Sequence, residues 1–249
     1  MKQQHNLIGL LIATFFSQTL HATSVALPYP TVVTLNLGPG WPTSTQSEVI
    51  ELLPNVNNRY MSTSNTDAFI DGELFVGWQE KINSCAYLAE SQLGLAYMVT
   101  NSAKINGVIW QANNPLFDNE TYAYRIKHSH VALRGKLLST PKETYQGYVT
   151  GSIGIAFNTS YAFNSQPVIS TVLPSPNFQT NTETDFSYTV AAGVQKKLNS
   201  NWAIGMGYQF ADWGKSRLSR APGQTMNTGP GFHNFYTSEA QFNLTYSVA

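Results

Sequence analysis

Apolar and polar residues alternate one by one along much of the chain, which is the period of a β-strand with two different faces. The clearest case is the segment EAQFNLTYSVA at 239–249, in which every second residue from Ala240 to Val248 is apolar or aromatic. TVVTLNLG at 31–38 and WAIGMGYQF at 202–210 follow the same rule. The pattern predicts strands that separate two environments, and helical periodicity is scarce.

Short and long connections alternate between these segments. The other predicted strands are AFIDGELFVGWQ at 68–79, CAYLAESQLGLAYM at 85–98, SHVALRGKLL at 129–138, YQGYVTGSIGIAF at 145–157 and DFSYTVAAGVQ at 185–195. Short turns fall near 81–83, 140–143 and 198–201, whereas long connections, such as 42–66 and 164–183, follow the first, third, fifth and seventh strands. An even number of strands of ~9–12 residues, tightly joined at one end only, is typical of a membrane barrel.

We therefore predict an all-β fold, an eight-stranded antiparallel up-and-down transmembrane β-barrel with four long extracellular loops and three short periplasmic turns. The final strand is predicted to pair with the first near Thr31–Gly38, because an open sheet edge is not tolerated in a bilayer. Its apolar face would then meet the acyl chains. The residues of this barrel-closure face are Phe242, Leu244, Tyr246 and Val248.

A soluble barrel with an apolar interior would also alternate, so the composition of the minority face decides between the two. Charged residues make up only 11% of the chain, against ~25% in soluble domains, which would leave a soluble barrel with a sparse charged exterior. The lumen side would carry the polar network of Asp71, Glu73, Glu90, Arg134, Lys136, Asp185 and Glu239. Buried charges need partners, so we expect pairing inside the lumen, with a conductive polar path as the alternative.

Aromatic residues at the ends of several strands fit the interfacial girdles of a membrane barrel. They are Trp78, Tyr97, Tyr145, Trp202 and Tyr246.

The first residues of the chain indicate export. Lys2, the apolar run Leu7–Phe16 and the small residue Ala22 are typical of a secretory signal peptide. We expect a signal peptide at 1–22 and a bacterial outer-membrane barrel domain at 23–249, with the single Cys85 packed or facing lipid.

His128-Ser129-His130 is the one cluster that suggests catalysis. Adjacent residues of a strand point to opposite faces, so the tripeptide cannot itself form a nucleophile–base dyad, and we interpret it as polar residues at the surface end of a strand. The sequence predicts no catalytic residues, no metal ligands and no cofactor. A net charge of zero gives no electrostatic support for nucleic-acid binding.

The segment GVQKKLNSNWAIGMGYQFADWGKSRL at 193–218 resembles the opacity-type outer-membrane β-barrel family of Gram-negative bacteria. Its hairpin LNSNWAIGMGYQF and the run Tyr208–Gly214 are especially similar, and the strands GELFVGWQ and QLGLAYM also look like that family. The resemblance implies an eight-stranded barrel inserted by the barrel-assembly machinery, with surface loops that contact host or environmental partners. It implies no catalytic residues.

The leading functional hypothesis is an envelope-structural and surface-interaction role through the loops, adhesin-like and host-contacting. A narrow porin for small solutes is the alternative, and a lipid A-modifying enzyme is a third hypothesis. The expected partners are outer-membrane lipid and lipopolysaccharide, the barrel-assembly machinery during insertion, and a host or environmental surface ligand.

Overall fold

The computed structural model describes residues 31–63, 67–83, 86–170 and 174–248, so the predicted signal peptide at 1–22 and Cys85 lie outside the described residues. The elements are β1 (Thr31–Pro42), β2 (Ser47–Leu53), β3 (Val56–Ser62), β4 (Phe69–Lys81), β5 (Leu88–Gln111), the 3-10 helix η1 (Pro115–Phe117), β6 (Asp118–Ser139), β7 (Tyr145–Pro167), β8 (Asn181–Lys197), β9 (Trp202–Asp212), β10 (Ser216–Arg217), β11 (Gly231–Phe232) and β12 (Tyr236–Ser247). Within these residues, no helix is long and apolar enough to cross a membrane.

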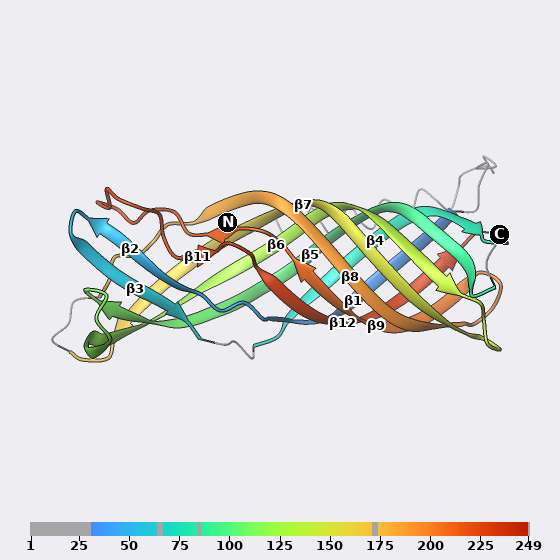
Figure 1. The fold of residues 1–249 in the computed structure, drawn as a ribbon, viewed down its shortest axis with the longest axis horizontal. Helices are drawn as coiled ribbons and strands as arrows, with labels where there is room; N and C mark the ends of the chain where they lie inside the picture. The colour runs from blue at the N-terminus through green and yellow to red at the C-terminus, as the bar shows by residue number, and fades with distance from the viewer. Residues whose placement is uncertain (1–30, 64–66, 84–85, 171–173, 249) are drawn as a thin grey trace, which may run out of the picture.

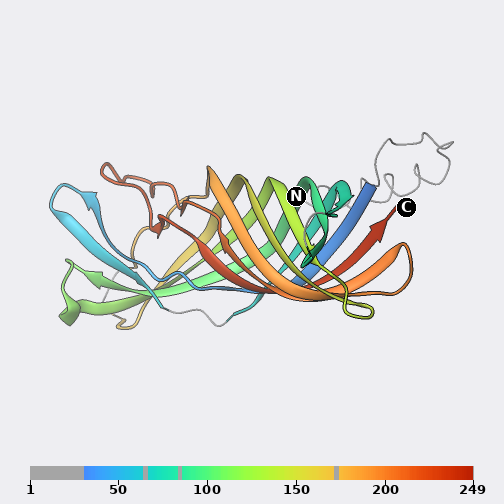
Figure 2. The same ribbon diagram turned by 45° about the vertical axis from the view of Figure 1, so that its right-hand side comes forward.

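Eight of the described strands form one closed antiparallel ring (Figures 1 and 2). Their order is β12, β1, β4, β5, β6, β7, β8 and β9, and β9 pairs again with β12. The seam between the first and last strands runs from Val32 opposite Ser247 to Pro42 opposite Thr237. The predicted eight-stranded up-and-down barrel is thus confirmed.

The outer surface of the ring carries a wide apolar belt. The side chains that point outward from its middle are exposed, and they include Leu35, Leu74, Leu95, Leu133, Ile153, Val190, Met206 and Leu244. Aromatic side chains lie at the end with the short turns, where the rings of Trp202 and Tyr246 are 4.8 Å apart. Others lie at the opposite edge, where Phe210 stacks on Tyr236 at 5.6 Å. This is the exterior of a membrane-spanning barrel.

Three strands continue far beyond the belt, which corrects the predicted strand length of ~9–12 residues. β5, β6 and β7 contain 24, 22 and 23 residues. On β5 a register shift between Val99 and Ser102 changes which alternate residues face inward. Before the shift the even-numbered residues, such as Gln92, are buried. After it the odd-numbered residues, such as Ala103 and Ile105, are buried. The apolar face therefore moves from the outside to the inside of the barrel.

The hairpin of β2 and β3 lies in the stretch 42–66, which the sequence predicts as a polar loop. Instead β3 pairs with β5 from Asn58 opposite Gln111 to Ser62 opposite Gly107. The hairpin stands at the end of the molecule away from the C-terminus (Figure 1). Inward and outward residues do alternate in this stretch. Its inward apolar residues, such as Ile50 and Tyr60, are separated by many polar residues, and for this reason the sequence predicts a loop.

The belt predicts a position-dependent cost of inserting charge. Leu95 pairs with Leu133 in the middle of the belt and is 63% exposed. We expect Leu95→Arg to lower the free energy of unfolding by roughly 2–4 kcal/mol, the cost of Arg at the bilayer midplane. Urea titration of the protein folded into lipid vesicles, followed by tryptophan fluorescence, measures this difference.

Thr121→Arg is the matched control, because Thr121 is exposed on β6 beyond the belt. It should change the stability by less than about 0.5 kcal/mol, as surface substitutions usually do. Equal losses for the two variants would show that the belt does not lie in lipid.

Candidate functional site

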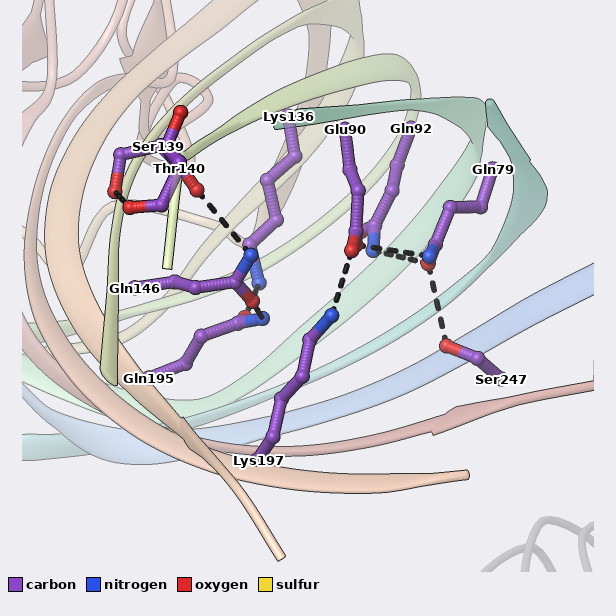
Figure 3. A network of polar contacts seen from close by, with 10 residues as sticks. All are labelled: Gln79, Glu90, Gln92, Lys136, Ser139, Thr140, Gln146, Gln195, Lys197 and Ser247. Atoms are coloured by element: carbon purple, nitrogen blue, oxygen red, sulfur yellow. Dashed lines mark hydrogen bonds and ion pairs between the residues drawn. The ribbon is translucent and has the colours of Figure 1, made fainter. Parts of the chain in front are cut away.

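The lumen at the end with the short turns is filled by a network of charged and amide side chains (Figure 3). Lys197 Nζ lies 2.6 Å from Glu90 Oε1, and Gln79 Nε2 donates to Glu90 Oε2 at 2.9 Å. Across the lumen Lys136 Nζ donates to Gln195 Oε1 at 2.7 Å. Glu90 therefore pairs with Lys197 rather than with either predicted base. The alternation that places Gln195 inward also places Lys197 inward and could have identified it.

The middle of the lumen holds the ion pair between Glu73 and Arg134. Asn36 Nδ2 donates to Glu73 Oε1 at 2.7 Å, and Arg134 Nε donates to Thr150 Oγ1 at 3.0 Å. The guanidinium also lies 5.7 Å from the centre of the Phe75 ring. Both charged side chains are at least 94% buried, so each depends on the other to offset the loss of water.

Farther toward the extracellular side, Asp71 and Glu239 face each other across β1. Both residues are fully buried; Asp71 lies opposite Gly38 of β1, and Glu239 lies opposite Gly40 of the same strand. Glu239 also accepts from Gln209 Nε2 at 2.7 Å. Gly40 on β1 leaves room for its neighbours, since a Cβ at that position would clash with the Phe69 ring and come within 2.8 Å of Glu239 Cγ. Neither carboxylate pairs with Arg134 or Lys136 among the described ion pairs.

Asp185 lies on the same face of β8 as the buried Ser187 and Thr189, but its described hydrogen bonds go to backbone groups rather than to the charged side chains of this network. Its carboxylate accepts from the backbone N–H groups of Phe186 and Lys215, at 2.8 and 2.9 Å. Asp185 therefore fastens the loop that follows β9 to β8. Alternation alone predicted an inward side chain and could not show that a loop returns to this position.

The loop between β9 and β12 turns back and places Trp213 inside the ring. Gly214 has φ +71°, a left-handed conformation that favours glycine, and its N–H donates to Asp212 Oδ1 at 2.9 Å. Trp213 is fully buried, and its Nε1 donates to Thr237 Oγ1 at 2.9 Å. The run 208–214, which carries the family resemblance, therefore contains Trp213, the side chain that fills the ring at this level.

His128 and His130 pack against this tryptophan, so their interpretation as surface residues is wrong. Their ring centres lie 3.8 and 4.9 Å from that of Trp213, and both residues are buried. His128 Nδ1 lies 2.7 Å from Asn158 Oδ1. Ser129 points to the opposite side, between Val99 and Phe157, so the tripeptide forms no dyad.

Above Trp213 the interior becomes an aromatic core. Tyr60, Tyr122 and Phe163 lie within 6.4 Å of one another, measured between ring centres, and Phe178 covers Phe163 at 4.9 Å. Burial raises the pKa of Tyr60 to about 12, so its hydroxyl stays neutral up to strongly alkaline pH. The interior of the extracellular extension is therefore packed like the core of a soluble domain.

A buried carboxylate holds the connection between β7 and β8 against this core. Glu120 accepts from Ser175 N at 2.8 Å and from Gln111 Nε2 at 2.7 Å. The cavity that remains between Tyr60, Tyr122 and Phe232 measures about 10 Å³, at the lower limit of the space that one water molecule needs. In the described part of the chain, no three His, Cys, Asp or Glu side chains are placed to hold a metal ion.

The fold and its filled interior together define a membrane barrel with a plugged extracellular extension. No family profile and no curated protein sequence shows a significant match to the chain. Among solved structures, the chain is similar to neisserial surface protein A (NspA), with 10% identity, a TM-score of 0.43, and coverage of 87% of this chain and 96% of that one.

Two further similar structures are of proteins from Escherichia coli and Yersinia pestis. The outer membrane protease OmpT of Escherichia coli matches with 12% identity, a TM-score of 0.43, and coverage of 92% of this chain and 99% of that one. The attachment invasion locus protein Ail of Yersinia pestis matches with 10% identity, a TM-score of 0.34, and coverage of 89% and 100%. Such low identities leave the function of this chain to be argued from its own residues.

The ion pair in the middle of the lumen predicts non-additive stability losses. Arg134→Met should lower the free energy of unfolding by about 3–5 kcal/mol, because it leaves the Glu73 carboxylate buried without its partner. Adding Glu73→Gln removes that charge and keeps an acceptor oxygen for Asn36, so the double variant should recover most of the loss. Urea unfolding in vesicles gives all the values of this double-mutant cycle.

The outcome that contradicts this pairing is additivity. If the losses of Arg134→Met and Glu73→Gln simply add in the double variant, the two side chains act independently.

Proposed function

We propose that the chain is an outer-membrane protein that binds a partner at the cell surface through the end of its extracellular extension. The support comes from the rigidity of that extension. β5, β6 and β7 carry the hydrogen-bonded sheet beyond the belt, and the aromatic core fills it. Extracellular segments held in this way present side chains in fixed positions, which reduces the entropy that binding would cost.

The observation that carries the proposal is a group of apolar side chains exposed at the end of the extension. Leu116 and Phe117, in the β5–β6 connection, are 85% and 47% exposed, and Val168 and Ile169, just after β7, are 65% and 49% exposed. We call these four residues the apolar tip. A backbone hydrogen bond of 2.7 Å from Val168 N to Asn119 O holds the two segments side by side.

The apolar tip lies at the far end of strands that leave the belt, so it does not serve as membrane anchor for the barrel. Exposed apolar groups rimmed by polar residues mark interaction surfaces in soluble regions of proteins. Asn113, Asp118 and Gln166 are exposed around it. This arrangement suits a partner with an apolar surface patch, such as a protein on a host cell.

The test is adhesion of Gram-negative cells that carry the protein to a cultured epithelial monolayer. We expect Leu116→Ser, Phe117→Ser and Val168→Ser together to lower adhesion by at least tenfold, since a few buried apolar anchors supply most of the energy of an interface. Heat-modifiable gel mobility should show that the barrel still folds.

The matched control changes three exposed polar residues of β6, β7 and β8 that lie away from the apolar tip, as Thr121→Ser, Asn164→Ser and Thr182→Ser. This variant should adhere like the wild type. If the apolar-tip variant adhered as strongly as this control, the tip would not be the binding surface, and the proposal would fail.

The narrow-porin hypothesis receives no support from the lumen. The ion pair of Glu73 and Arg134 crosses its middle, and Trp213 with His128 and His130 closes it above. The interior of an eight-stranded barrel is only wide enough for side chains, and here large side chains fill it.

We therefore expect the wild-type protein to produce no current steps in planar lipid bilayers. A wide trimeric porin inserted into the same membranes serves as the positive control for the recording. Stable ohmic steps from the purified, folded protein would contradict the plugged lumen.

A further inference from the structure

The outer surface of β5 and β6 changes from apolar to basic just beyond the belt. Val99 and Phe157 are exposed and flank Ser129, and they lie at the upper edge of the belt on these strands. From Ser129 toward the extracellular extension, the next outward residues of β6 are Lys127 and then Arg125, and both are exposed. Lys104 on β5 is exposed and lies directly opposite Arg125. We call these three residues the basic patch.

The three side chains are close enough to act on one anion. Directly opposed residues of an antiparallel pair have Cβ atoms ~5 Å apart, and residues i and i+2 of a strand lie ~7 Å apart on the same face. Arg125 and Lys127 form the centre of the patch. Besides Lys104, their partners on the flanking strands are Ser102, Thr159 and Tyr161, which supply hydroxyl groups and no charge.

The height of the basic patch above the belt selects the ligand. With strands tilted by about 40°, two residues rise ~5 Å along the membrane normal, which places Lys127 about 5 Å and Arg125 about 10 Å above the apolar edge. The polar headgroup zone of a bilayer is ~5–8 Å deep on each side. Long basic side chains extend toward this zone from positions nearby.

We propose that the basic patch binds the phosphate groups of a phosphorylated glycolipid in the outer leaflet that surrounds the barrel. Guanidinium and ammonium groups are the side chains that bind phosphate best, and Arg does so through two parallel hydrogen bonds. The acyl chains of the same lipid would lie against Val99, Val131 and Phe157 directly below. The side of the barrel that carries β5 and β6 would thus hold an ordered lipid.

A soluble polyanion is the rival ligand, and the position of the basic patch disfavours it. A sulfated or phosphorylated chain in solution would favour cations at the outer end of the extracellular extension. The arginines there already have partners: Arg217 pairs with Glu48 at 2.6 Å, and Arg59 donates to Asn113 Oδ1 at 2.7 Å. The cations of the basic patch instead lie beside the lipid belt.

The test measures binding of purified lipid A to the refolded chain in detergent. One probe is lipid A with both phosphates, and the other is the same lipid A after enzymatic removal of both. We expect the wild type to prefer the phosphorylated probe, and Arg125→Gln with Lys127→Gln to weaken its binding about thirtyfold, as expected for the loss of two cations near anionic lipid.

Lys81→Gln with Lys142→Gln is the matched control, because it removes the same charge from exposed positions at the opposite end of the barrel. It should change the affinity less than threefold, and heat-modifiable mobility should show that both variants fold. Equal affinity for the two lipid A probes would overturn the proposal, as would equal losses in the two double variants.

A heparin oligosaccharide tests the rival ligand. If it bound in a manner that depends on Arg125 and Lys127 while lipid A did not, the basic patch would recognise a soluble polyanion and the proposal would be overturned. The result is separate from that of the adhesion test, because variants of the apolar tip should keep full affinity for phosphorylated lipid A.

Discussion

The hydrogen-bonded seam between β1 and β12 is the constraint on which the rest of the structure depends. Lipid offers no partner to a backbone N–H or C=O group, so a sheet inside a bilayer must close on itself. Closure creates an inside and an outside, and it fixes which alternate residues of each strand face the lumen. The apolar belt, the ion pair of Glu73 and Arg134 and the inward position of Trp213 all follow from this division.

The same strands then serve two opposite arrangements. Within the membrane, the polar residues are inside and the apolar residues outside; in the extracellular extension, the arrangement is reversed around Tyr60, Tyr122 and Phe163. On β5 the register shift after Val99 accompanies the reversal. Trp213 and the two histidines lie at the boundary, where they separate a lumen of charged and amide side chains from an aromatic core. The two proposed binding surfaces lie where these arrangements contact their surroundings, the apolar tip in water and the basic patch beside the lipid.

The sequence predicts the membrane part well because one rule, alternation in two chemically distinct environments, holds throughout it. It places Asp71, Glu73, Arg134 and Lys136 on the inner face from strand periodicity alone. It fails where long-range contacts override that rule. The β2–β3 hairpin pairs with β5 only because β5 extends beyond the belt, and the hydrogen-bond partner of Asp185 comes from a loop 30 residues farther along the chain. The partners of His128 and His130 are likewise set by a returning loop that no local pattern shows.

The exchange of apolar for basic residues on the outer surface of β5 and β6 also fixes the position of the barrel along the membrane normal. Sliding outward would lift Val99 and Phe157 into water, and sliding inward would draw Lys127 among acyl chains. A shift by the length of two residues in either direction therefore costs free energy, outward by exposing apolar side chains to water and inward by burying a charge in lipid. The free-energy minimum between these two positions is narrow. The protein would in this way keep its extension at a constant elevation above the membrane, and bilayers of different thickness would have to adapt to the barrel.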